Sequence, residues 1–367
     1  LYRFGNRWTD CSKNLSKIGK TTEEYEEYEM IRILMLGGTG AIGESILSVI
    51  GNDVVYDITV TSRNKRKSLY ANVHYLLGNA NDFDFINTFD VLIDFMNYRN
   101  EILKTNFSKL IRIAKQYVFL SSARVYDNSM PFIDESCSLL ANTTENQSFK
   151  DSGTYAVKKA HQEKYVLKNG CNKVTIVRPY KTYSSDRLQL GEYEIKHWLN
   201  RIINDKPIVL NRGILDKYTA LTDGVDVAKG IVELLGNEAA LGQIFQVVTN
   251  EYMTWNDVLL LYSEILHKYS YKPVIYLADD TKEIDKLFEG GYQMPYDIMY
   301  NRRFHSANIS KITQITYKSM KDGLQEAIAL YLQNHTKGNY ISTEYDNIVD
   351  WYIEYHDLVR WEDGLNA

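Results

Sequence analysis

The sequence predicts an α/β protein, a doubly wound parallel sheet with a smaller C-terminal substrate domain, on three observations. First, an apolar stretch of strand length, Ile31–Leu36, runs into a glycine-rich turn and then an amphipathic helix. Second, further apolar runs of strand length alternate with helical segments as far as Val177. Third, the chain has 367 residues and 44% hydrophobic residues, enough for a second domain after the sheet.

The turn after the first strand carries three glycines spaced three residues apart. A turn of this kind leaves backbone N–H groups facing an anion, and glycine lets a pyrophosphate approach where a Cβ would collide. Because a buried strand precedes the glycines and the apolar face of a helix follows them, the pattern predicts a dinucleotide site. The residues expected to hold the cofactor here are Gly37, Thr39, Gly40, Ile42 and Gly43.

The next two predicted strands bring polar residues to the same edge of the sheet. Asp57–Ser62 ends at Arg63, about 20 residues beyond the glycines, where Asp or Glu favours NAD and Arg accommodates the 2′-phosphate of NADP. We therefore expect NADP in preference to NAD, with a solvated basic loop as the alternative. Val73–Leu77 ends near Asn79, in a turn that we expect to lie beside the adenine.

The remaining elements of the sheet are predicted from recurring apolar runs. The expected strands are Val91–Phe95, Tyr117–Leu120, Val174–Val177 and Ile244–Val248, and helices are expected over Glu101–Lys115 and Gly153–Lys168. Asp127–Ser152 shows no strong periodicity, which predicts a loop or an irregular insertion.

A tyrosine and a lysine, Tyr155 and Lys159, lie one turn apart on the predicted helix Gly153–Lys168, so both project to the same side. A phenol, with a reference pKa of about 10, is a poor base at neutral pH, and a nearby ammonium stabilises its anion. Ser122, just after a strand end, offers a hydroxyl that can orient a substrate oxygen. Taken alone, such a tyrosine and lysine are more often a core and a surface residue.

In combination and in this order, the motifs resemble the extended short-chain dehydrogenase/reductase family, the NAD-dependent epimerase/dehydratase group. The matching segments are GGTGAIG at 37–43, FLSSARVY at 119–126, YAVKKAHQE at 155–163, VRPY at 177–180, LTDGVDVAKGI at 221–231 and ALGQIFQVV at 240–248. The resemblance implies a Rossmann fold, NADP or NAD as cofactor and a nucleotide-linked sugar as substrate.

The same resemblance implies the roles of individual residues. Tyr155 is similar to the family's acid/base, Lys159 to the partner that also holds the cofactor ribose, and Ser122 to the hydroxyl that orients the substrate. Arg187 and Arg302 are candidates for binding a substrate diphosphate, with ordinary surface arginines as the alternative.

One segment departs from the family pattern. Residues 178–184 read RPYKTYS and lack the usual asparagine and glycine, and no acidic residue stands where NAD-using epimerases hold the ribose. The reaction therefore stays open between an epimerase, a dehydratase and an NADP-dependent keto-sugar reductase. A function of another class, a non-catalytic dinucleotide-binding sensor or an RNA-binding module, is the remaining alternative.

Charge and composition narrow the partners and the compartment. A formal net charge of -5 and a pI near 5.9 give no overall attraction to nucleic acid or to anionic membranes. The three cysteines are far apart, which fits a reducing compartment and no metal site. No apolar run approaches the roughly 20 residues that cross a bilayer. We expect a cytoplasmic homodimer without a membrane segment.

The chain is expected to divide into four parts. Residues 1–29 form a polar extension, and Met30 is the expected natural start. Residues 30–180 form the dinucleotide-binding domain, to which a segment near 205–250 returns. Residues 181–204 and 251–338 form the substrate domain, and 339–367 form a tail beyond the resemblance.

Overall fold

The computed structural model describes residues 2–4, 7–9, 30–335, 337–338 and 342–362. Its centre is a sheet of seven strands, all paired in parallel, in the order β13-β8-β7-β6-β3-β4-β5. The strands are β3 (Ile31–Leu36), β4 (Tyr56–Ser62), β5 (Val73–Leu77), β6 (Phe89–Asp94), β7 (Ala114–Leu120), β8 (Val174–Pro179) and β13 (Ile244–Val247). Because β4 and β6 flank β3, the winding direction reverses beside β3, so the predicted doubly wound fold is confirmed.

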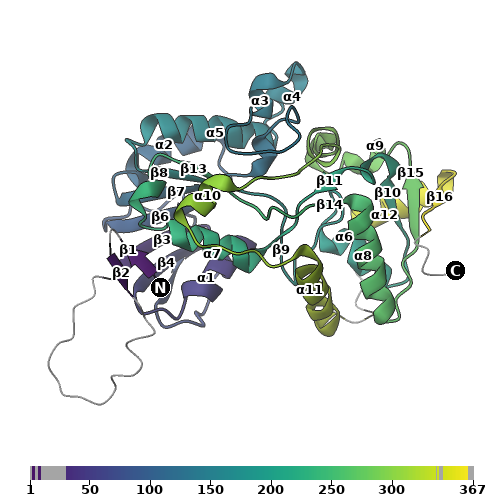
Figure 1. Ribbon diagram of the computed structural model, residues 1–367, viewed down its shortest axis with the longest axis horizontal. Coiled ribbons are helices and arrows are strands. Elements are labelled where there is room, and N and C mark those ends of the chain that lie inside the picture. Colours follow the sequence, from purple (N-terminus) through teal and green to yellow (C-terminus); the bar gives the residue numbers. More distant parts are fainter. Residues whose placement is uncertain (1, 5–6, 10–29, 336, 339–341, 363–367) are drawn as a thin grey trace, which may run out of the picture.

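Helices cover both faces of the sheet (Figure 1). Those on one face are α1 (Ala41–Ile50), α7 (Gly224–Leu234) and α10 (Ala307–Ile312), and those on the other are α2 (Asn100–Leu110) and α5 (Tyr155–Asn169). Alternate residues of β3 enter the two cores, Ile33 and Met35 on the α1 side and Leu34 and Leu36 on the α2 side. A strand buried on both faces needs apolar residues at every position, which explains its continuous apolar run.

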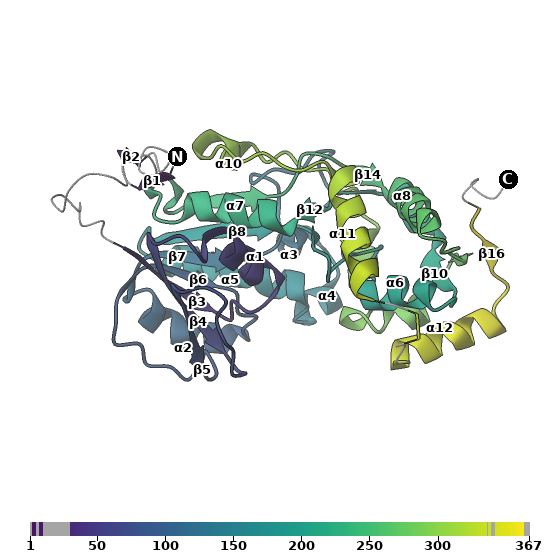
Figure 2. The same ribbon diagram turned by 90° about the horizontal axis from the view of Figure 1, so that it is seen from below.

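A smaller C-terminal lobe lies beside this domain (Figure 2). Its sheet has the order β10-β15-β16 and consists of β10 (Ile208–Asn211), β15 (Ile275–Ala278) and β16 (Val359–Arg360). Around it lie α6 (Ile195–Ile203), α8 (Trp255–Lys268), α9 (Lys282–Asp285), α11 (Met320–Asn334) and α12 (Glu344–Tyr355). This lobe has its own buried core, in which Trp198 and Tyr262 stack with ring centroids 4.7 Å apart.

Two expected domain boundaries are wrong. The segment near 205–250 returns to the main sheet only from α7 onward, because β10 pairs in parallel with β15 in the C-terminal lobe. Residues 344–360 are no tail: Tyr345, Val349 and Tyr352 lie on one face of α12 and are buried in the core of the C-terminal lobe. Conversely, α10 leaves the expected substrate domain and packs on the main sheet through the buried Ile309.

Local differences from the sequence expectation are smaller. The expected helix Glu101–Lys115 ends at Leu110, since residues from Ala114 onward pair with β6. The irregular insertion contains two short helices, α3 (Leu140–Thr143) and α4 (Gln147–Asp151). In the expected N-terminal extension, β1 (Tyr2–Phe4) and β2 (Arg7–Thr9) pair antiparallel, and residues 10–29 lie outside the described part.

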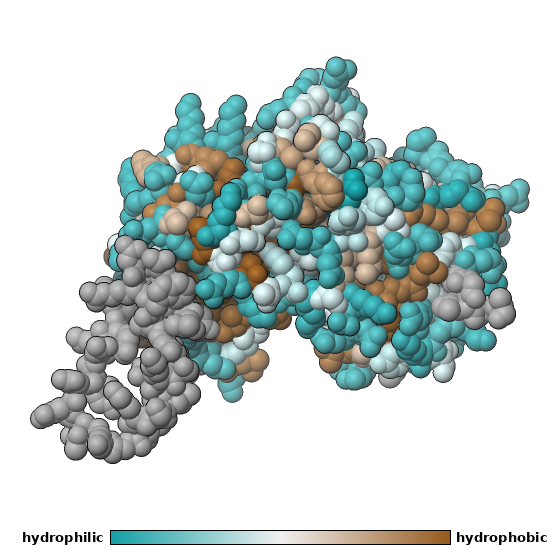
Figure 3. Space-filling view, in the orientation of Figure 1, coloured by the Kyte–Doolittle hydropathy of each residue, from teal (hydrophilic) through white to brown (hydrophobic). Residues whose placement is uncertain are grey.

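The remaining strands are two-residue pairs that join the two lobes: β9 (Thr182–Tyr183) with β12 (Thr222–Asp223), and β11 (Tyr218–Thr219) with β14 (Met253–Thr254). On the face drawn in Figure 3, hydrophilic residues predominate and apolar residues lie in separate patches. Within the described ranges, every helix is too short or too polar to cross a membrane.

Candidate active site

A cavity of about 560 Å³ opens at the carboxyl ends of the central strands. Its walls include the glycine turn after β3, Leu120–Ser122 at the end of β7, and Pro179, Lys181 and Thr182 at and beyond the end of β8. The C-terminal lobe closes the far side with residues that include Phe288 and Glu289. This is the edge of the sheet where doubly wound proteins bind their ligands.

The glycine turn leaves open space in front of the N-terminus of α1. Gly37 has a φ of +70°, a conformation that side chains disfavour. A Cβ at Gly43 would lie 2.1 Å from the carbonyl oxygen of Gly38, so this glycine lets α1 begin close to its own turn. A Cβ at Gly40 would meet no atom within 4 Å, and Gly40 lines the cavity. The N-terminus of α1 therefore faces open space, the environment that favours an anion.

The other expected cofactor residues divide into those in the cavity and those outside it. Ile42 lines the cavity, whereas Thr39 does not. Arg63 and Asn79 follow β4 and β5 at the same edge of the sheet, and both side chains are exposed outside the cavity. Ser121 lines the cavity, and its buried hydroxyl has no hydrogen-bond partner among the described residues. An open glycine turn and an unsatisfied hydroxyl in one cavity fit a dinucleotide.

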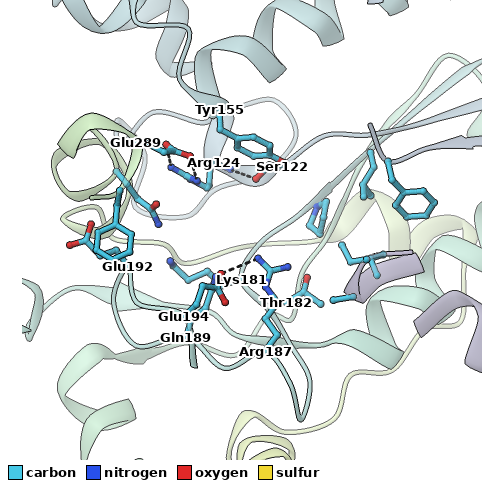
Figure 4. Close-up of a pocket in the computed structure, with 18 of the residues that line it drawn as sticks. Ser122, Arg124, Tyr155, Lys181, Thr182, Arg187, Gln189, Glu192, Glu194 and Glu289 are labelled. Atoms are coloured by element: carbon cyan, nitrogen blue, oxygen red, sulfur yellow. Dashed lines mark hydrogen bonds and ion pairs between the residues drawn. The ribbon is translucent and has the colours of Figure 1, made fainter. Parts of the chain in front are cut away.

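Ser122 and Tyr155 meet on one wall of the cavity (Figure 4). Both side chains line the cavity, and the Ser122 hydroxyl accepts a hydrogen bond from the backbone N–H of Arg124 at 3.2 Å. Burial raises the pKa of the Tyr155 phenol, while the charges of Arg124 and Arg187 and the Ser122 hydroxyl act in the opposite direction. The structure thus brings the expected acid/base and the expected orienting hydroxyl together.

Lys159 lies behind this wall and does not line the cavity. Its side chain is buried, and its Nζ donates to the carbonyl oxygens of Leu120 at 2.7 Å and Met96 at 3.2 Å. Burial lowers the pKa of Lys159 to about 8, against the charge of the buried Asp94. Its Nζ lies 5.9 Å from the centroid of the Tyr155 ring. Lys159 therefore ties the ends of β6 and β7 together beside the phenol.

Arg124 is a residue of this wall that the sequence reasoning missed, although it lies inside the quoted motif. Its guanidinium carbon is 5.5 Å from the centroid of the Tyr155 ring. Both terminal nitrogens donate to Glu289, at 2.9 and 2.6 Å, and its Nε lies 3.4 Å from a carboxylate oxygen of Asp297. Both carboxylates come from the C-terminal lobe, and no motif marked them in the sequence.

The opposite wall carries a second set of charged residues (Figure 4). The Nζ of Lys181 donates to the carbonyl oxygen of Gly191 at 3.0 Å and lies 3.8 Å from Asp297. Burial lowers the pKa of Lys181 to about 8. Arg187 lines the cavity as expected and lies 3.5 Å from Glu194. Lys181 stands where the family pattern has asparagine, within the segment 178–184 whose departure the sequence showed, although the sequence did not single out the lysine itself.

Arg302 does not reach the cavity, contrary to the expected contact with a substrate. Its side chain is fully buried, and its Nε lies 3.2 Å from Asp297. The terminal nitrogens donate to the backbone carbonyls of Tyr126, Asp127 and Tyr296. Arg302 therefore joins the polypeptide after β7 to the C-terminal lobe.

In the described ranges, no three metal-ligand side chains gather into a possible metal site.

Comparison with known proteins gives a match to one family model. Residues 92–247 match the family model described as the NAD dependent epimerase/dehydratase family. The match spans β6 to β13 and contains Ser122, Tyr155 and Lys159, and the resemblance inferred from the motifs is thereby confirmed.

Solved structures of the family's fold superpose on most of the chain. A UDP-N-acetylglucosamine 4-epimerase from Methanobrevibacter ruminantium is 16% identical with a TM-score of 0.65, covering 84% of this chain and 100% of that one. A UDP-glucuronic acid 4-epimerase from Bacillus cereus, solved with NAD, is 13% identical with a TM-score of 0.63, covering 83% and 97%. At these identities the likeness establishes the shared fold.

A curated relative has a different description. The chloroplast stem-loop binding protein of 41 kDa b from Arabidopsis thaliana is 24% identical over 251 residues. The alignment takes in 62% of this chain and spans only 61% of the relative's own length.

Proposed function

We propose that this chain is an NAD(P)-dependent enzyme that oxidises or reduces a sugar carbon of a nucleotide-linked substrate. The observation that carries the proposal is that Tyr155 and Ser122 line the same cavity as the glycine turn. The cavity of about 560 Å³ has the size of a typical ligand site, roughly 300–1,000 Å³. Structures of similar fold solved with UDP-N-acetylmuramic acid and with UDP-glucuronic acid support a nucleotide sugar as the substrate class.

The residues of the cavity have distinct roles in this reaction. A bound nicotinamide would supply the acceptor or donor of two electrons. In the oxidising direction, the phenolate of Tyr155 removes the proton from the sugar hydroxyl. The Ser122 hydroxyl donates to the same sugar oxygen and fixes its position. In the reducing direction, the Tyr155 phenol returns the proton to the keto oxygen.

The three reactions of the family differ in how often these steps occur. A reductase needs only the reducing direction. An epimerase needs both directions, and the keto-sugar must rotate in the site between them so that its other face is reduced. In a dehydratase, the oxidised sugar also loses a molecule of water. The same tyrosine and serine serve all three reactions, so product analysis must separate them.

The test is a panel of nucleotide sugars supplied with NAD or NADP, with products identified by NMR. Inverted stereochemistry at unchanged mass indicates an epimerase, loss of water a dehydratase, and stoichiometric consumption of NADPH a reductase. Tyr155→Phe is expected to lower kcat by about 10²–10⁴-fold, the usual contribution of a general acid or base. The control is Tyr165→Phe, which removes a hydroxyl from the same helix far from the cavity. Full turnover by Tyr155→Phe would refute the proposal.

For the cofactor, we propose NADP, held at its 2′-phosphate by Arg63. The exposed Arg63 follows β4, the strand next to the glycine turn. Arg63→Ala is expected to weaken NADP about tenfold, which corresponds to one charge-assisted hydrogen bond, and to leave NAD unchanged. Lys65→Ala is the matched control. If the unaltered chain binds NAD more tightly than NADP in calorimetry, this assignment is wrong.

A second candidate function is the binding of RNA stem-loops. The curated chloroplast relative and one surface feature support it: four basic side chains, Arg63, Lys65, Arg66 and Lys67, are exposed on a single loop. Mobility shifts with a stem-loop RNA at several salt concentrations test this candidate. Binding that weakens steeply with salt and disappears when the four are changed to Gln supports it. RNA binding that is unchanged when the four residues are replaced contradicts this candidate.

A homodimeric state and a cytoplasmic location remain predictions.

A further inference from the structure

Arg124 occupies an unusual position for a charged residue in this cavity. It follows Ser122 in the one-turn helix η2 (Ala123–Val125), so its backbone is fixed by the end of β7. Its guanidinium lies against the ring of Tyr155, with the carbon 5.5 Å from the ring centroid. Only 17% of its side chain is exposed. An arginine buried to this degree needs carboxylate partners.

The partners come from two unusual turns of the C-terminal lobe. Glu289 has a φ of +48°, and Gly290 and Gly291 after it also have positive φ. Asp297 lies in the π-helical turn η6 (Met294–Ile298). Positive φ at a non-glycine residue and π-helical turns cost free energy and are frequent at functional sites. Both turns here bring a carboxylate to the same guanidinium.

The charges around Tyr155 can be named from every element that faces it. Arg124 comes from η2, Lys159 from α5, Arg187 from the segment after β9, and Glu289 from the C-terminal lobe. Lys159 is engaged with two backbone carbonyls of the strand ends. Arg124 therefore has the most direct access to the phenol, and Glu289 opposes its effect.

We propose that Arg124 is a positioning residue for the catalytic tyrosine, held by Glu289 and Asp297 of the C-terminal lobe so that its guanidinium orients the Tyr155 ring and stabilises the phenolate. Its consequence for turnover rests on the proposed function, whereas the coupling between Arg124 and Tyr155 does not. The carboxylate of Glu289 partly neutralises the guanidinium of Arg124, so the position of this turn determines how strongly Arg124 stabilises the Tyr155 phenolate.

The two charges predict opposite effects on the pKa of Tyr155. A unit charge within about 4–6 Å shifts a pKa by about 1–3 units, and the pairing of Arg124 with two carboxylates places its effect at the low end of that range. Arg124→Gln is therefore expected to raise the Tyr155 pKa, and Glu289→Gln to lower it. Arg124→Lys keeps the charge and is expected to keep the pKa closer to that of the unaltered chain. Lys164→Gln, on the exposed side of α5, is the control for removal of a charge.

The experiment is ¹⁹F NMR of the full chain labelled with 3-fluorotyrosine, titrated from neutral to alkaline pH. Fluorination lowers the pKa of the phenol, which brings its titration into an accessible range, and Tyr155→Phe identifies the resonance by its loss. Opposite shifts for Arg124→Gln and Glu289→Gln, with none for Lys164→Gln, support the proposal. An unchanged midpoint in Arg124→Gln, or shifts of both variants in the same direction, would overturn it. If Arg124→Gln does not fold, Arg124→Lys and Glu289→Gln carry the test, and a midpoint unchanged in Glu289→Gln overturns the proposal.

The titration needs no substrate, so it separates this proposal from the proposed function. Opposite shifts in a chain that turns over no nucleotide sugar would support the Arg124 coupling and refute the enzyme assignment. Where turnover is measurable, kcat is expected to rise with pH as Tyr155 loses its proton. Arg124→Gln should shift the midpoint of this rise to higher pH, whereas a loss of packing alone would lower kcat without shifting the midpoint.

Discussion

Two alanine substitutions in the glycine turn separate its role in folding from its role in binding. At Gly43 an added Cβ would lie 2.1 Å from the carbonyl oxygen and 2.6 Å from the carbonyl carbon of Gly38. Both are backbone atoms, which cannot rotate away, so α1 or the turn must move. Such overpacking costs about 1–3 kcal/mol. We expect Gly43→Ala to lower Tm by on the order of 2–10 °C and to weaken dinucleotide binding.

Gly40→Ala is the matched variant because nothing within 4 Å obstructs its Cβ. Its φ of -92° and ψ of 178° are extended values that alanine adopts readily. The entropy gained by replacing glycine, about 0.4–1 kcal/mol, offsets the few tenths of a kcal/mol lost at this helix N-cap. The Tm should therefore stay nearly constant, whereas the Cβ occupies the space in front of the α1 N-terminus and weakens binding.

Thermal unfolding without cofactor and calorimetric titration with NAD and NADP provide the two readouts. The expected pattern is a lower Tm for Gly43→Ala only and weaker binding for both variants. If Gly40→Ala binds both dinucleotides as the unaltered chain does, the turn does not carry the pyrophosphate. An unchanged Tm for Gly43→Ala would contradict the steric argument.

Two further predictions concern stability. Burial lowers the pKa of His197 from 6.5 to about 4, so between these values only the unfolded chain binds this proton and stability falls as the pH decreases. Between pH 7 and pH 5 the free energy of unfolding should fall by about 1 kcal/mol because of this part-exposed group. Urea unfolding at the two pH values should show this decrease in the unaltered chain and not in His197→Phe. In the buried pair of Arg178 and Glu163, with N–O distances of 2.9 and 2.5 Å, Glu163→Gln should cost about 3 kcal/mol. Glu44→Gln, in the exposed pair with Arg66, should cost less than about 1 kcal/mol, and equal costs would contradict the argument.

The parts of the fold that the sequence predicted are those determined by local pattern. A strand buried on both faces is a continuous apolar run, and a glycine turn has few alternative explanations, so Ile31–Gly43 could be interpreted directly. Ser122 and Tyr155 were predictable because each lies in a short motif at the boundary of an element, Ser122 just after the end of β7 and Tyr155 at the start of α5. Helix ends were less predictable, as the early end of α2 at Leu110 illustrates.

The carboxylates that hold Arg124 were not predictable because they owe their position to the packing of the C-terminal lobe. Glu289 and Asp297 lie in turns without a sequence motif, and only the packing of that lobe brings them to Arg124. Arg302 shows the opposite error. Its sequence position suggested a contact with substrate, but Asp297 and three backbone carbonyls occupy its donors inside the core.

The charges of the two lobes converge on one carboxylate. Asp297 is fully buried and lies 3.4 Å from Arg124, 3.8 Å from Lys181 and 3.2 Å from Arg302. These cations keep the pKa of Asp297 below its usual value even though burial acts to raise it. Lys181 replaces the asparagine of the family pattern, and its ammonium is compensated by a carboxylate that also holds Arg124 beside Tyr155. The departure at Lys181 and the cation at Arg124 therefore belong to one electrostatic unit, in which one buried carboxylate compensates both charges.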